Sequence, residues 1–334
     1  MSHSTFDLVG VGNPIMDLLA HVPESFLTQH VPGDKGGMVL VDDADLAGLV
    51  RTLDGALAIA PGGSAANTIL SAAQLGLRTS YVGKVGSDPT AAQYLEFVAA
   101  AGTDSSHVKR ATLPHGRCLS LVTPDGQRTM RTHLGAAMTL SPAEISPADF
   151  QGARHAHIEG YLLFNPALAE QVITSARAAG CTISIDLASF EVVKAARDWI
   201  FAQLRLGVDI VFANEDEASA LFDRTDDYAN FARELAAFGG IAAVKLGKDG
   251  AWLAQRDTLH RVAPVTVSRV VDTTGAGDAW AAGFLYGHLR GASLAHAGAV
   301  ASILGAECVQ HLGAAIPHVR WPQVRGAALP HVSA

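Results

Sequence analysis

The chain has 334 residues, of which 49% are hydrophobic and 17% are charged, so it has enough apolar side chains for a large buried core. Its formal net charge is −8 and its basic residues are scattered, which argues against a nucleic-acid-binding protein. Cys118, Cys181 and Cys308 lie far apart in the sequence, so neither a disulfide framework nor a zinc site is predicted, and a reducing cytoplasm is the expected location.

The N-terminal segment, "MSHSTFDLVGVGN", has no charged leader region and no long apolar stretch, so we predict a first β-strand there and no signal peptide. Residues 55–77 carry no charge, but "APGGSAAN" interrupts them with a proline, paired glycines and an asparagine. The sequence therefore predicts no membrane-spanning segment.

Two stretches contain extended segments without long helices between them. The first includes "IMDLLAHVP" and "GGMVLVD", and the second is "GRCLSLVTPDGQRTMRTHL", in which "PDGQ" is typical of a hairpin turn. We predict a small, discontinuous β-rich lobe from about residues 14–44 and 115–140, attached to the edge of a main sheet, where it could act as a lid.

Elsewhere, short β-rich runs alternate with helical segments rich in Ala and Leu. The runs are "FDLVGVG", "SYVGKVG", "HAHIEGY", "TISIDLA", "DIVFAN" and "IAAVKLG". This alternation predicts a single α/β domain over residues 1–334 with a mainly parallel sheet and helices on both faces. Ligands of such sheets usually bind beyond the carboxyl ends of the strands.

The last predicted element is a helix over 279–289 that follows "DTTGAGD". Gly275 and Gly277 allow backbone N–H groups to approach an anion closely, and the positive end of the helix dipole points at the same place. Asp278 is adjacent, and as an isolated feature it is explained by a stabilising acid in a first helical turn. Beside a phosphate site, the same carboxylate would be suited to accepting a proton from an attacking hydroxyl group.

Three motifs together make a resemblance specific. "DTTGAGDAWAAGFLYG" resembles the C-terminal signature of the PfkB, or ribokinase-like, family of sugar and nucleoside kinases, and "APGGSAANTILSAAQLG" with "YVGKVGSD" resembles its second signature. "NEDE", residues 214–217, resembles the family's Asn-x-x-Glu element. The motifs occur in the family's order, and the resemblance spans about residues 7–318.

This resemblance implies a three-layer αβα sandwich with a small β lid, and Mg-ATP-dependent phosphorylation of a hydroxymethyl group. It implies that Asp278 is the general base. It further implies that Gly275, Ala276 and Gly277 supply backbone amides to the transferring γ-phosphoryl group. Phosphoryl transfer depends mainly on positioning and charge stabilisation, which these residues suit.

For the acceptor, the resemblance implies that the backbone of Gly62 and Gly63 approaches its ring or ribose and that Asn67 bonds its hydroxyl groups. The alternative for this segment is a tight strand-to-helix turn with Ser64 as the N-cap. Asp17 occupies the place of a family acid that binds two acceptor hydroxyls; otherwise it is a solvated aspartate at a strand end.

A nucleoside acceptor requires an aromatic or apolar slot for its base. Tyr161 and Phe190 lie where the adenosine kinase-like branch places aromatic residues against the base, and Met38 on the lid could close the slot, although such residues are more often core packing. Arg128 is a candidate for contact with substrate or phosphate, with a solvated hairpin arginine as an equally supported alternative.

On the nucleotide side, "VKLGKDGAW" resembles the family's ATP-binding turn, in which Gly247 and Gly250 permit close contact. The sequence departs from the family at Lys245, where many members have threonine, so that its role in ATP binding is left open.

The resemblance implies that Asn214 and Glu217 help to hold Mg²⁺ and its waters around the ATP phosphates. The alternative for Glu217 is an ordinary first-turn helix acid. Thr274, beside the nucleotide phosphates, and Asp272 match the region where many relatives bind a monovalent cation, K⁺.

The sequence as a whole predicts a kinase that transfers the γ-phosphoryl group of ATP to the 5′-hydroxyl of adenosine or a related purine nucleoside. A sugar kinase of the ribokinase, fructokinase or ketodeoxygluconate kinase type is the alternative enzyme. A non-catalytic nucleoside or sugar sensor is the alternative of another class. The expected partners are these small molecules alone, without nucleic acid or membrane, and the chain is expected to be a monomer or a homodimer.

Overall fold

A computed structural model describes residues 5–33, 35, 37–53, 55, 57–125, 127–225 and 227–332. Positions 34 and 36 of the expected small lobe, and position 126 of the expected "PDGQ" turn, lie outside the described residues.

The larger of the two main sheets has nine strands and is parallel over most of its width. In spatial order its strands are β16 (Thr258–Val262), β15 (Ala251–Gln255), β14 (Ile241–Lys245), β13 (Ile210–Asn214), β12 (Thr182–Asp186), β11 (Ala153–Glu159), β1 (Phe6–Val11), β5 (Thr79–Val82) and β7 (Thr103–Asp104). The pairs from β14 through to β7 are parallel, and β15 and β16 add an antiparallel edge. All six predicted β-rich runs contribute a strand to this sheet.

Side chains on both faces of the large sheet are buried, because successive residues of a strand point to opposite faces. Phe212 of β13 packs into the core on one face, whereas its neighbours Val211 and Ala213 pack into the core on the other. The two cores explain why these strands are almost continuously apolar and do not alternate with polar residues.

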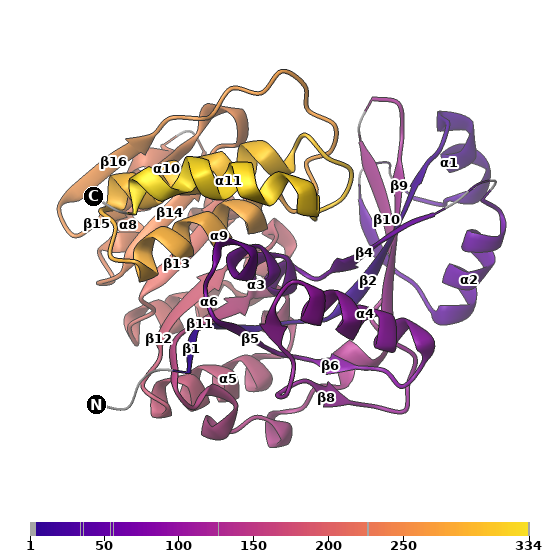
Figure 1. The fold of residues 1–334 in the computed structure, drawn as a ribbon, viewed down its shortest axis with the longest axis horizontal. Helices are drawn as coiled ribbons and strands as arrows, with labels where there is room; N and C mark the ends of the chain where they lie inside the picture. The colour runs from indigo at the N-terminus through magenta and orange to yellow at the C-terminus, as the bar shows by residue number, and fades with distance from the viewer. Residues whose placement is uncertain are drawn as a thin grey trace.

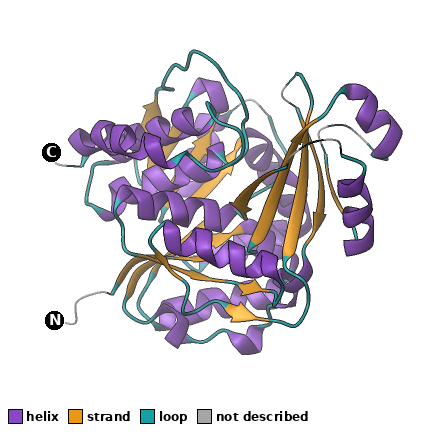
Figure 2. Ribbon diagram, turned by 45° about the vertical axis from the view of Figure 1, so that its right-hand side comes forward, coloured by secondary structure: helices purple, strands orange, loops and turns teal. Residues whose placement is uncertain are grey.

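Helices cover each face of the sheet (Figures 1 and 2). One core contains residues of α3 (Ser64–Leu75), α4 (Pro89–Ala100), α9 (Ala276–Leu289), α10 (Leu294–Cys308) and α11 (Trp321–Ala328). The other contains residues of α5 (Pro166–Ala178), α6 (Phe190–Arg205), α7 (Glu215–Phe222) and α8 (Tyr228–Ala236). The predicted α/β fold, in which a mainly parallel sheet lies between two layers of helices, is confirmed.

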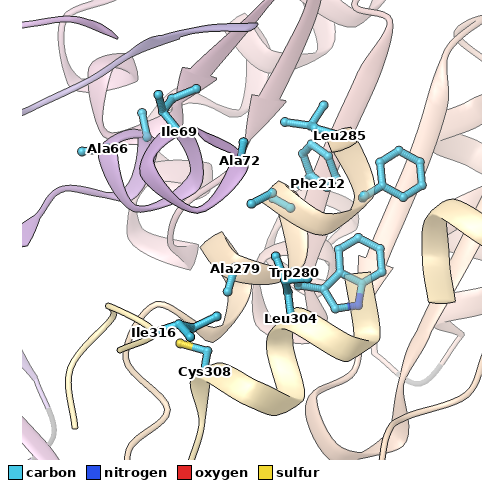
Figure 3. Close-up of a cluster of buried hydrophobic side chains, with 14 of the residues drawn as sticks. Ala66, Ile69, Ala72, Phe212, Ala279, Trp280, Leu285, Leu304, Cys308 and Ile316 are labelled. Carbon is cyan, nitrogen blue, oxygen red and sulfur yellow. The ribbon is translucent and has the colours of Figure 1, made fainter. Parts of the chain in front are cut away.

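Helix α9 is central to the first core, as Figure 3 shows. Most of its side chains are buried all round, which is why its sequence lacks the polar face of a surface helix. The rings of Trp280 and Phe284 stack at 5.7 Å, and Phe212 meets Phe284 edge-on at 5.6 Å. This packing fixes the axis of α9 relative to the sheet, and therefore the place to which its N-terminus points.

The second sheet has five strands and stands beside the first (Figure 1). Its strand order is β3 (Met38–Leu40), β10 (Arg128–His133), β9 (Gly116–Val122), β2 (Ile15–His21) and β4 (Ala58–Gly62). Helices α1 (Glu24–His30) and α2 (Asp43–Arg51) lie on its outer side, and β6 (Lys84–Val85) pairs separately with β8 (Lys109–Arg110). Strand β4 lies outside the ranges 14–44 and 115–140 expected for the small lobe; "AIAPG" resembles a loop in sequence, and its pairing with β2 places it in the sheet.

No helix among the described residues has both the length and the apolar composition that crossing a membrane would require.

Candidate active site

The N-terminus of α9 is shaped by Gly275. This residue has φ +69°, and a Cβ atom there would lie 2.3 Å from the Cβ of Ala314, so both backbone conformation and space require glycine. The left-handed residue starts the helix at Ala276, three residues before the expected start at 279. The Ala276 and Gly277 amides therefore belong to the first helical turn, where the backbone N–H groups have no partner within the helix and favour an anion.

Asp278 lies in this first turn and is held by helix α3. The Ser64 hydroxyl donates to its Oδ1 at 2.8 Å, and Asn67 Nδ2 donates to its Oδ2 at 2.9 Å. The Thr68 hydroxyl donates to its backbone carbonyl at 3.2 Å. Burial raises the pKa of Asp278 to about 6, against the lowering effect of the Asn67 and Ser64 hydrogen bonds. The carboxylate is thus rigidly placed and has a pKa suited to taking up a proton near neutral pH.

The turn between β4 and α3 brings Asp17 to the same region. Gly63 is the N-cap of α3 with φ +98°, and a Cβ atom there would lie 2.3 Å from the Asn13 carbonyl oxygen. A Cβ atom on Gly62 would lie 2.4 Å from Asp17 Oδ1, so this glycine permits the Asp17 carboxylate to pack against the backbone. Ser64 is therefore the first helical residue and not the expected N-cap, and its hydroxyl is free to bond Asp278.

Three charged side chains lie around Asp17: Arg128 of the five-stranded sheet, Asp278 of α9 and Asp272 of the loop before α9. Burial raises its pKa to about 7, with Asp278 and Asp272 acting in the same direction and Arg128 opposing them. Arg128, from the second sheet, is also paired with Asp272, with 3.5 Å between Nε and Oδ1. The aspartates of the large domain and the arginine of the small sheet thus meet at one place.

The Asp272 carboxylate is fully engaged in hydrogen bonds to Thr274, in the loop before α9, and to Gly313. Its Oδ1 accepts from the Thr274 amide at 2.9 Å and from the Thr274 hydroxyl at 2.6 Å, and its Oδ2 accepts from the Gly313 amide at 2.8 Å. These bonds explain why the carboxylate is almost fully buried without destabilising the fold. The two residues expected near a monovalent cation therefore lie together, in contact with the Gly313 loop.

Three polar side chains emerge at the carboxyl ends of β12, β13 and β14. Asp186, Asn214 and Lys245 are the last residues of these strands, and Asn214 is the register partner of Lys245. Lys245 Nζ donates to Asp186 Oδ2 at 2.7 Å. Because the strands are parallel, their carboxyl ends meet at one edge, which is where α9 also begins.

Asn214 and Glu217 form a reciprocal capping box at the start of α7. The Asn214 side chain donates to Glu217 Oε1 at 2.7 Å, and the Glu217 amide donates to Asn214 Oδ1 at 2.8 Å. Glu217 is buried, and burial together with the charge of Asp186 raises the pKa of its carboxyl group. Glu217 is therefore a first-turn helix acid, and its position is also compatible with a role near Mg²⁺, because its carboxyl group interacts electrostatically with Asp186, Lys245 and Asp278.

A cavity of about 480 Å³ opens beside the N-terminus of α9. Five of the residues expected on the nucleotide side line it: Lys245, Gly247, Gly250, Ala276 and Gly277. The rest of its wall is mostly apolar and includes Val265, Val267, Trp280 and Val309. The cavity thus combines an apolar compartment with the anion-attracting helix N-terminus and two lysine side chains, Lys245 and Lys248.

The three residues expected to enclose a base lie in different places. Tyr161 follows β11 in a short turn, and its pKa is raised by burial and by the charges of Glu159, Asp278 and Glu217, so it lies within reach of the site. Phe190 instead lines an open hollow on α6 and α7 with Lys194 and Arg224. Met38 is 42% exposed on the edge strand β3.

The sequence analysis missed three positioning groups. Ser64 was interpreted only as a cap, although its spacing of three from Asn67 puts both on one helix face. Glu159 and Asp186 end parallel strands, a position that itself suggests a site. Glu159 accepts from the amides of Asn13 and Ala65, both at 3.1 Å, and so joins β1 to the start of α3. Burial raises its pKa to about 7.

Comparison with known proteins accounts for this arrangement. The model of the family described as pfkB family carbohydrate kinase matches residues 42–321. A nucleoside kinase of Methanothermobacter thermautotrophicus is 31% identical, over 75% of this chain and 79% of its own. Two solved structures cover 98% of this chain and 99% of their own at 32% identity: a probable sugar kinase of Rhizobium etli, with a TM-score of 0.88, and an adenosine kinase of Sinorhizobium meliloti, with a TM-score of 0.86. With the strand order, the glycine turns and Asp278 in place, the chain belongs to the pfkB family of carbohydrate kinases and is a phosphotransferase that acts on an alcohol group.

Proposed function

We propose that this kinase transfers the γ-phosphoryl group of ATP to the 5′-hydroxyl of adenosine or a related purine nucleoside. The observation that carries the proposal is the position of Asp278. Its carboxylate is held by Ser64 and Asn67 at the helix N-terminus that borders the 480 Å³ cavity, and its charge reaches Asp17 on the other side. A base between a nucleotide pocket and a second carboxylate that can bind a diol is an arrangement suited to transfer to a hydroxyl group of a ribonucleoside.

In this proposal the apolar part of the cavity takes the adenine ring of ATP, and the Ala276 and Gly277 amides face its γ-phosphoryl group. The acceptor lies between Asp17, the Gly62 and Gly63 turn and Asp278. The acceptor oxygen forms a bond to the γ-phosphorus while the bond from that phosphorus to the β–γ bridging oxygen breaks. ADP leaves with the electron pair, and Asp278 takes the hydroxyl proton.

Asn214 and Glu217 are suited to holding a divalent ion through the water molecules bound to that ion. Their oxygens are hard donors of the type that Mg²⁺ prefers, but they are engaged with each other, so water and phosphate oxygens would complete the coordination. When bound, Mg²⁺ would neutralise charge on the phosphates. Asp272 and Thr274 would border a K⁺ site, and the five-stranded sheet would close over the acceptor through Arg128, which excludes water.

Formation of ADP from Mg-ATP with adenosine, inosine, guanosine, ribose, fructose or ketodeoxygluconate as acceptor tests the proposal. We expect adenosine to give the highest kcat/KM, because a purine base would add apolar contacts, Tyr161 among them, that a free sugar cannot make. The likeness to a sugar kinase makes a sugar the specific alternative. Turnover with a sugar alone would overturn the nucleoside assignment and retain the chemistry.

Loss of the Ser64 hydroxyl is expected to shift the pH dependence of the reaction. The Ser64 hydrogen bond lowers the pKa of Asp278, so Ser64→Ala raises that pKa above its value of about 6. The base is then protonated over a wider range, and the acidic limb of kcat/KM moves to higher pH, with little change at pH 9.

Thr68→Val is the matched control, since Thr68 bonds the Asp278 backbone carbonyl and not its carboxylate. Its acidic limb should coincide with that of the wild type. An unchanged limb in Ser64→Ala would contradict the assignment of this limb to Asp278.

A further inference from the structure

Besides the Asp278 carboxylate, the site contains a buried positive charge, the ammonium group of Lys245. The side chain is only 12% exposed, and the Asp186 carboxylate that it contacts is 5% exposed. Burial of the ammonium is offset by the charges of Asp186, Glu217 and Asp278, which together raise the pKa of Lys245 above its ordinary value. The group is therefore positively charged near neutral pH.

The ammonium group lies against the helix N-terminus. A Cβ atom on Gly277 would come within 3.2 Å of Lys245 Nζ, so the absence of a side chain at Gly277 leaves the ammonium room beside the backbone there. Lys245 also lines the cavity together with Ala276 and Gly277. An ammonium has three N–H donors, and the bond to Asp186 uses one of them.

Asp186 is itself held at a strained point of the chain. Its Oδ1 accepts from the Ala188 amide at 3.1 Å, and Ala188 has φ +64°, a left-handed conformation that is unfavourable for a non-glycine residue. The turn after β12 therefore adopts an unfavourable backbone in which one carboxylate oxygen binds the turn and the other binds Lys245. Strain of this kind is tolerated where the position of a group matters.

We propose that Lys245 is a catalytic residue that donates a hydrogen bond to the γ-phosphoryl group during its transfer, and that Asp186 is the positioning residue that holds the ammonium beside Gly277. This inference rests on the proposed kinase function and deepens it. The positive charge of Lys245 would add to the charge stabilisation that the helix N-terminus supplies.

Lys245 gives up no proton in this step. The proton of the acceptor hydroxyl passes to Asp278, the new bond forms between the acceptor oxygen and the γ-phosphorus, and the bond to the leaving ADP oxygen breaks. The ammonium remains charged and bonds a phosphoryl oxygen whose negative charge is stabilised as transfer proceeds. Its contribution is thus to the transition state, and kcat is the quantity that should change.

The test compares Lys245→Met, Asp186→Asn and the double variant with the wild type, using Mg-ATP and the best acceptor of the panel. We expect Lys245→Met to lower kcat by about 10²–10³-fold, as loss of one transition-state donor does, with the Kd for ADP changed less than about threefold. Asp186→Asn should lower kcat by about tenfold, because the ammonium is retained but less well placed. The double variant should be no less active than Lys245→Met, since Asp186 acts through Lys245.

Lys109→Met is the matched control. Lys109 pairs with Asp149, whose side chain is also 5% exposed, but this pair joins β8 to the turn at residues 147–150. The Lys109→Met substitution should leave kcat unchanged. If Lys245→Met is poorly folded because Asp186 is left unpaired, the double variant, which removes both charges, measures the loss of the ammonium in its place.

Two results would overturn the inference alone: a kcat for Lys245→Met within threefold of an active wild type, or recovery of wild-type kcat in the double variant, which would show that Lys245 only balances the charge of Asp186. Absence of wild-type turnover with every acceptor would instead overturn the proposed function, and this inference with it.

Discussion

Substitution of Asp278 by asparagine is expected to lower kcat by about two to four orders of magnitude, the usual contribution of a general base, while ATP still binds. The substitution preserves shape and most of the hydrogen bonds. The Asn67 amide can donate to the new side-chain oxygen, and the Ser64 hydroxyl, which now donates to the carboxylate, can accept from the new amide group. The protein should therefore fold, and its cavity should remain intact.

The measurement is kcat in the ADP-forming reaction, together with the Kd for ADP and the Tm of each protein. Asp45→Asn is the control, because Asp45 is also an acid in the first turn of a helix but lies on α2 and is exposed. We expect it to behave as the wild type. Asp278→Asn with kcat within tenfold of the wild type, and with normal ADP binding, would show that another group takes the proton.

Replacement of Asp17 by asparagine should have opposite effects on catalysis and on stability. A carboxylate that binds two acceptor hydroxyls contributes about 1.5–3 kcal/mol through each charged hydrogen bond, so its loss should raise the acceptor KM by at least about tenfold. Gly62 brings the Asp17 carboxylate against the backbone, and asparagine, of the same size, fits the same space. The KM for ATP should not change.

The stability effect follows from the raised pKa of Asp17. Its pKa is about 7 in the folded protein, against about 3.9 in an unfolded chain, so between these values the folded state binds a proton that the unfolded state does not. Ionisation of Asp17 therefore lowers the free energy of unfolding as pH rises through this window. Asp17→Asn removes the ionisation, and in the absence of ligands we expect a higher Tm than the wild type at pH 8 and an equal Tm at pH 4.

Thermal unfolding of both proteins across pH 4–8 checks this, with Asp45→Asn as the control that should follow the wild type. A Tm difference that is the same at pH 4 and pH 8 would contradict the assignment. Loss of stability in Asp17→Asn at pH 8 would show that the carboxylate is needed to hold the fold.

Six of the nine strands of the large sheet were predictable, because each of them is a short apolar run next to a helical segment, whereas β7, β15 and β16 were not predicted. The same rule located the site at the carboxyl ends of the strands, including Asn214 and Lys245. Strand β4 was not predictable, since "AIAPG" contains a proline and a glycine and becomes a strand only by pairing with β2.

Contacts between segments far apart in sequence also could not be predicted. Ser64 and Asp278 are 214 residues apart, and neither segment contains a signal for their hydrogen bond. Phe190 follows a core strand as Tyr161 does, yet the turn at Ala188 places it at the hollow on α6 and α7. Local pattern predicts which edge of the sheet a residue reaches, whereas the direction of its side chain depends on turn geometry.

Helix α3 places a constraint on how this enzyme can diverge. Its first turns supply the hydrogen bonds that fix the Asp278 carboxylate, so with Asp278 as the proposed base we expect a change at Ser64 or Asn67 to alter the chemical step whichever acceptor is bound. Asp17 and Arg128 belong instead to the five-stranded sheet, whose strands can be altered while α3 and α9 stay as they are. We therefore expect new acceptor preferences in descendants of this chain to be acquired through that sheet, with the phosphoryl-transfer end inherited unchanged.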